Sequence, residues 1–133
     1  MTQVRLDVHD VPTANGINGE MQALHIALKP AGEDVPFATL MGVGGLAFRI
    51  YWYVGSEEDG SAGQWSDSSL EAASGMHPVY MACQWLGWSY NAYNENTLDE
   101  FYRLAKESID NGIPALTRGP VGEPIPALIV GYY

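Results

Sequence analysis

The chain has 133 residues, 47% of them hydrophobic and 17% charged, which is the size of one ordinary domain with enough apolar material for a packed core. Sixteen acidic against six basic side chains give a net charge of −10, which disfavours nucleic acid and acidic membrane surfaces as partners. The lone Cys83 excludes an internal disulfide and leaves no Cys pair for a zinc site.

Neither a signal peptide nor a membrane span is expected, because the N-terminus is charged and no window holds about 20 apolar residues. We therefore expect one cytoplasmic domain over residues 1–133, with no metal and no cofactor. A small molecule or a peptide remains a possible ligand.

The first third of the chain predicts a strand and two helices. Apolar residues alternate with polar ones over residues 4–8, which is typical of a half-buried strand, and 11–19 has the composition of a turn. Apolar residues then recur at a spacing of three to four, which predicts a helix that is capped by Asn18 and ends near Pro30. These residues are Met21, Leu24, Ala27 and Leu28. A shorter helix, opened by residues 34–36, runs through Met41 and ends at the GVGG sequence of residues 42–45.

The middle of the chain predicts a long strand and a long loop. Residues 46–54 alternate between two faces, as a strand does, and 55–69 is polar and rich in Gly and Ser. The acids of that loop lack the ligand spacing of an EF-hand, so a solvated loop is the better interpretation.

The last part predicts two helices and three strands. A helix begins at Pro78 and ends at Gly87, and the sequence WSYNAY of residues 88–93 favours a strand. Thr97 and Glu100 have the form of a capping box, which predicts a helix over residues 98–110. The sequences ALT and ALIVGYY, residues 115–117 and 127–133, are expected to be closing strands that can pair as a hairpin.

This order predicts an α+β fold in which helices pack on a small antiparallel sheet. The chain stops directly after an apolar strand, where a sheet normally continues. That ending is typical of a chain truncated after its last strand, and it also predicts a homo-oligomer in which a second subunit covers the free edge.

Four stretches, GEMQAL, DVPFATLMGVGGLAF, GIPALTRG and ALIVGYY, resemble the papain-like cysteine peptidase superfamily. The nearest branch includes C39-type peptidases and the N-terminal domain of the butirosin-biosynthesis acyltransferase. The resemblance covers about residues 15–133 and implies a papain-like fold. It places the family's Cys nucleophile, which lies at the start of the first long helix, at Gly19, and the family's His near Ile125 or Pro126.

Neither Gly19 nor Ile125 nor Pro126 can perform the family's chemistry, so the resemblance implies a pseudoenzyme. Three hypotheses remain. In the first, the helix start binds a small molecule, peptide or acyl group through Asn15, Asn18, Gly19 and Glu20. The second is an active hydrolase or acyltransferase in which Glu20 is the base and Asn15 or Asn18 is the oxyanion donor. The third is an oligomeric interaction module. The first and third rank above the second, because every expected catalytic group is absent.

Other candidates have simpler interpretations. Cys83 and His77 are six residues apart and face different directions on a helix, so Cys83 is expected in the core. His25 lies in mid-helix, and the adjacent His9 and Asp10 point to opposite faces of a strand. The GVGG sequence lacks the Lys-Ser/Thr of a phosphate loop. Four aromatic residues can line a ligand groove or belong to the core and its rim: Trp85, Trp88, Tyr90 and Tyr93.

Overall fold

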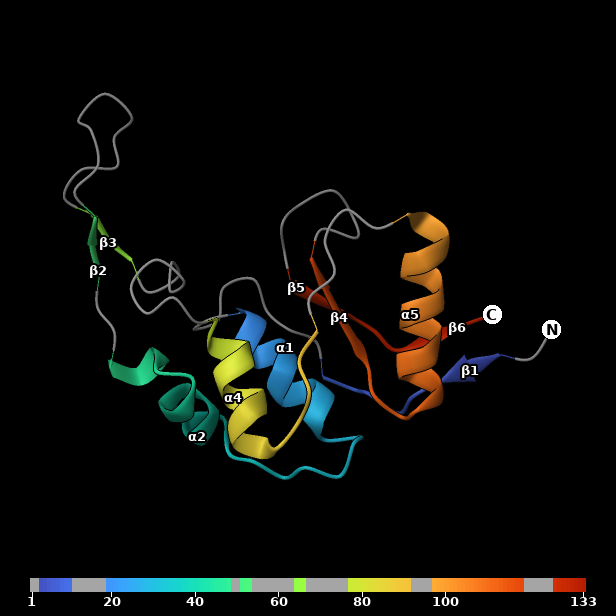
Figure 1. Ribbon diagram of the computed structural model, residues 1–133. Helices are drawn as coiled ribbons and strands as arrows, with labels where there is room; N and C mark the ends of the chain where they lie inside the picture. Colours follow the sequence, from blue (N-terminus) through green and yellow to red (C-terminus); the bar gives the residue numbers. More distant parts are fainter. Residues whose placement is uncertain are drawn as a thin grey trace. The chain divides into compact units, whose positions relative to one another are not determined.

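The computed structural model is α+β, with helices and antiparallel strand pairs (Figure 1). It divides into two compact units, residues 1–37 with 91–133 and residues 38–90. The prediction of one domain is not tested by this division. The structure describes residues 3–10, 19–48, 51–53, 64–66, 77–91, 97–118 and 126–133.

The first unit contains two antiparallel strand pairs. β4 (Ala115–Arg118) pairs with β5 (Pro126–Ile129), as the predicted hairpin requires. β6 (Gly131–Tyr132) pairs with β1 (Val4–Arg5), and the N–H of Leu6 donates to the carbonyl of Val130 at 2.7 Å. The N-terminal segment therefore covers part of the closing strand, for which the sequence predicts a free edge.

α1 (Gly19–Leu28) packs against β4 and β5. The helix ends where the N–H of Glu33 donates to the Leu28 carbonyl at 3.0 Å, around Gly32 at φ 87°. These bounds confirm the predicted helix, whereas its predicted cap Asn18 lies outside the described residues. Most of α1 is buried, through Met21, Ala23, Leu24, Ile26, Ala27 and Leu28.

α5 (Leu98–Asp110) packs against β1, β4 and β6 and confirms the predicted helix. The Thr97 hydroxyl caps it by accepting a hydrogen bond from the N–H of Glu100 at 3.3 Å. The structure gives the Glu100 carboxylate no bond back to Thr97 within the described residues, so only half of the capping box is made. Ala105 and Ile109 are buried on the side of the strands.

The second unit contains most of α2 (Phe37–Val43), a 3₁₀ turn over Leu46–Phe48, and α4 (Pro78–Leu86). It also contains β2 (Tyr51–Tyr53), which pairs antiparallel with β3 (Gln64–Ser66). α4 ends as predicted at Gly87, which adopts a left-handed φ of 76°.

Three strand and loop predictions in this unit are wrong over part of their length. Leu46–Phe48 form a 3₁₀ turn directly after Gly45, whose left-handed φ of 75° follows the end of α2. The predicted loop 55–69 contains β3, which forms only through its pairing with β2. Residues 88–91 are not a strand, and the N–H of Trp88 donates back to the Cys83 carbonyl at 2.8 Å. Residues 92 and 93 lie outside the described residues.

Candidate functional site

The positions that the resemblance assigns to the nucleophile and the histidine lie against each other. Gly19 is the first residue of α1 and Pro126 is the first residue of β5. A Cβ atom built on Gly19 would lie 3.2 Å from Cγ and 3.5 Å from Cδ of Pro126. Because 3.2 Å is closer than ordinary van der Waals contact, the lack of a side chain on Gly19 lets the proline ring approach the helix start.

This pair has no means of acid–base or nucleophilic chemistry. Glycine has no side chain, and proline has neither a titratable group nor an N–H. Glu20, the next residue of α1, is half-buried. The other proposed site residues lie outside the described residues, namely Asn15, Asn18 and Ile125. No described contact therefore supports the active-enzyme hypothesis.

An open groove of about 400 Å³ lies elsewhere in the first unit. It is lined by residues 3–5, Thr117 and residues 127–133, on the strands β1, β4, β5 and β6. Neither Gly19 nor Glu20 belongs to this lining, so the groove does not extend along the start of α1.

Cys83 and His77 do not form a catalytic dyad. The Nδ1 atom of His77 accepts a hydrogen bond from the N–H of Val79 at 3.3 Å and so caps α4. Cys83 is 5% exposed, and this burial raises the pKa of its thiol. A raised pKa suppresses the reactive thiolate at neutral pH. The interpretation of Cys83 as a core residue is therefore confirmed.

The remaining histidines take separate positions. His9 Nε2 lies 2.7 Å from the carboxylate of Asp7, whereas Asp10 accepts a hydrogen bond from Lys29 Nζ at 2.9 Å. That hydrogen bond and the charge of Lys29 lower the pKa of Asp10. The ring of His25 lies 5.7 Å from that of Phe37 in a tilted arrangement. Adjacent His9 and Asp10 thus take different partners, but not as residues of a strand, because β1 ends at Arg5 and the predicted strand over residues 4–8 is wrong beyond it.

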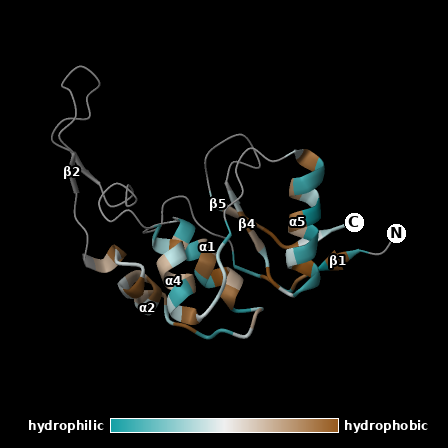
Figure 2. Cartoon of the chain, in the orientation of Figure 1, coloured by the Kyte–Doolittle hydropathy of each residue, from teal (hydrophilic) through white to brown (hydrophobic). Residues whose placement is uncertain are grey.

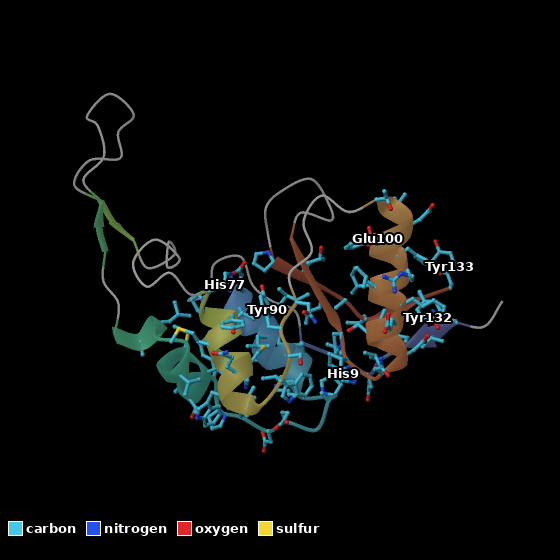
Figure 3. The ribbon with its side chains drawn as sticks, viewed as in Figure 1. His9, His77, Tyr90, Glu100, Tyr132 and Tyr133 are labelled. Carbon is cyan, nitrogen blue, oxygen red and sulfur yellow. The ribbon has the colours of Figure 1, made fainter. Side chains whose placement is uncertain are left out.

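Tyr90, one of the four aromatic residues named above, lies beside His77 in the second unit (Figure 3). The Tyr90 ring stacks on His77 at 5.9 Å and meets Tyr80 edge-on at 6.1 Å. Gln84 donates to the Tyr80 hydroxyl at 2.6 Å. Trp85, at 56% exposure, belongs to the surface. These contacts make a rim cluster, and Tyr93 lies outside the described residues.

Sequence reasoning missed a polar cluster that joins α5 to β6. Lys106 Nζ donates to the Tyr132 hydroxyl at 2.7 Å and to Asp110 at 3.0 Å, and the Tyr132 hydroxyl donates to Asp110 at 2.5 Å. The hydrogen bonds from Tyr132 and Lys106 lower the pKa of Asp110, and those to Tyr132 and Asp110 raise the pKa of Lys106. The i, i+4 spacing of Lys106 and Asp110 is the only part of this cluster visible in the sequence.

Sequence reasoning also missed an exposed apolar surface at the start of α5. Leu98 is 81% exposed, Phe101 41% and Tyr102 51%. Their i, i+3, i+4 spacing is a signal that the sequence contains, but this spacing is equally typical of a buried helix face.

Within the described ranges, no three His, Cys, Asp or Glu side chains are grouped so as to hold a metal ion. No helix in these ranges is long and apolar enough to cross a membrane.

Comparison with protein-family models, with curated proteins and with solved structures finds no match to this chain.

Proposed function

We propose that the chain is a papain-like domain that has lost its catalytic groups and acts by binding a peptide, a protein or a small molecule. The contact between Gly19 and Pro126 carries this proposal. In a cysteine peptidase the thiol and the imidazole must lie within hydrogen-bond reach of each other. The resemblance assigned these two roles to positions far apart in the sequence, and their contact supports that assignment.

Binding is the role that such a site retains. The N–H groups at the start of α1 and the positive end of the helix dipole suit a carboxylate or a carbonyl oxygen. The Pro126 ring already takes the close approach that Gly19 permits, so binding at this site relies on the N–H groups and the dipole of α1. Self-association of the chain is a second form of this role, and the exposed apolar residues of α5 favour an interaction surface in general.

The proposal is tested by restoring the two family residues. We compare Gly19→Cys alone, Gly19→Cys with Pro126→His, and Gly19→Cys with Pro126→Gln, which removes the same ring without adding an imidazole. Alkylation by iodoacetamide is followed against pH through the mass of the peptide that contains position 19, so that Cys83 does not interfere.

A neighbouring imidazolium stabilises a thiolate, so the variant with Pro126→His is expected to react at a pH about one unit or more below the other two. Identical pH profiles in the three variants, each shown by circular dichroism to be folded, would contradict the papain-like arrangement.

A further inference from the structure

α5 carries one apolar stripe, of which only part is covered. Ala105 and Ile109 are 8% and 2% exposed, since the C-terminal half of the helix packs on the strands. The same stripe continues through Leu98, Phe101 and Tyr102, which are 41–81% exposed. In Figure 2, apolar colouring extends to the N-terminal end of α5. Clustered exposed side chains of this size are typical of an interaction site.

The charge beside this stripe is acidic. At about 100° per residue, Asp99 lies about 60° from Tyr102 around the helix axis, whereas Glu100 lies about 160° away. The side chain of Asp99 has no partner within the described residues. The two basic residues of α5 are engaged inside the helix, Arg103 with Glu107 at 3.3 Å and Lys106 with Asp110. The exposed stripe therefore has a carboxylate beside an aromatic ring, and Arg103, the basic residue one turn from Asp99, is paired with Glu107.

The C-terminal end of α5 shows how a tyrosine and a carboxylate can hold a cation. Lys106 Nζ lies 4.3 Å from the centroid of the Tyr132 ring and donates to Asp110. A cation is thus held between a tyrosine and a carboxylate, which combines a cation–π contact with a charge-assisted hydrogen bond. Tyr102 and Asp99 are the same two residue types, three residues apart on the exposed half of α5, and Tyr102 meets Tyr132 edge-on at 6.4 Å.

We propose that the N-terminal half of α5 is a docking surface for a basic amphipathic helix of another protein. Leu98 and Phe101 receive its apolar face, and an Arg of the partner lies over Tyr102 and pairs with Asp99. The net charge of −10 favours a cationic partner and opposes a second copy of the chain. This inference rests on the proposed binding role, but it uses no residue of the Gly19–Pro126 contact, so the two tests can fail separately.

The test uses a fluorescein-labelled synthetic helical peptide of about four turns with Leu on one face and Arg on the other. Two further peptides serve as controls, one with Glu in place of Arg and one with the Arg peptide's composition in scrambled order. Binding to the full chain is measured by fluorescence anisotropy at several salt concentrations. The wild-type chain is expected to bind the Arg peptide at least about tenfold more tightly than either control peptide.

Matched variants locate the surface. Leu98→Gln with Phe101→Gln keeps helix propensity and is expected to weaken binding by about fivefold or more. Trp85→Gln, which removes an aromatic side chain of α4 that is 56% exposed, is expected to leave binding unchanged. Asp99→Asn is expected to weaken peptide binding at low salt and to reduce the salt dependence of the affinity. Glu100→Gln makes the same charge change on the far side of the helix and is expected to leave the affinity and its salt dependence unchanged.

Equal affinity for the Arg and Glu peptides would overturn the proposal, as would unchanged binding by the folded variant with Leu98→Gln and Phe101→Gln. Sedimentation of the wild-type chain supplies a further test. Self-association that disappears with Leu98→Gln and Phe101→Gln would assign the surface to a second copy and overturn the partner proposed here.

Discussion

The helices α1 and α5 pack on the strands of the first unit in two different ways, α1 on β4 and β5 and α5 on β1, β4 and β6. α1 is buried over most of its ten residues and carries few polar groups. α5 is buried at Ala105 and Ile109 only, has a hydroxyl cap and two internal ion pairs, and leaves its other side chains half-buried or exposed. An apolar helix depends on its surroundings, whereas a capped and charged amphipathic helix has free surface left for an external partner.

The largest difference is expected when a large side chain is truncated on each helix. Met21 of α1 is fully buried and Leu98 of α5 is 81% exposed. Met21→Ala is expected to reduce the free energy of unfolding by about 2–5 kcal/mol, because it removes core contacts and leaves a cavity. Leu98→Ala should change it by no more than about 0.5 kcal/mol. Urea unfolding of both variants measures these values, and similar losses would contradict the comparison.

A smaller effect is expected at the strands on which α5 packs. A Cβ on Gly131 would lie 2.6 Å from the backbone oxygen of Val4 and 3.1 Å from Cα of Arg5. Gly131→Ala must therefore push β1 away from β6, and we expect a loss of about 1–3 kcal/mol in the free energy of unfolding. Gly42→Ala is the control, because its added Cβ meets no atom within 4 Å and alanine favours the helix. A neutral Gly131→Ala would show that β1 does not pair with β6.

The smallest effect concerns the polar cluster that joins α5 to β6. Tyr132 and Lys106 lower the pKa of Asp110, so the folded state favours its ionised form. Its contribution to stability is present above the pKa of the unfolded chain and is lost as the pH falls through the lower pKa of the folded chain.

Asp110→Asn is therefore expected to lower the melting temperature at neutral pH, and this deficit should shrink toward zero as the pH falls to about 2. Thermal unfolding followed by circular dichroism checks this, with Asp34→Asn as an exposed acid control. A deficit that stays constant across this pH range would show that the Asp110 carboxylate does not contribute through its charge.

Much of the helical structure follows from local signals. Thr97 starts α5 and Gly87 ends α4 through hydrogen bonds within a turn or two of the helix, which sequence patterns capture well. The strands are less predictable. β3 exists through its pairing with β2, and Leu46–Phe48 continue a turn although their alternating pattern is typical of a strand. Alternation reports that side chains face two ways, but it does not report whether a partner strand is present.

The candidate site divides in the same way. The absence of a nucleophile at the start of α1 can be read from Gly19 alone, and the acidity of the chain from its composition. Tertiary structure decided three other features. These are the contact of Gly19 with Pro126, the pairing of β6 with β1, and the length of the α5 stripe that stays exposed. The physical reason is that caps and helix periodicity act within a few residues, whereas register and burial depend on which distant segments meet.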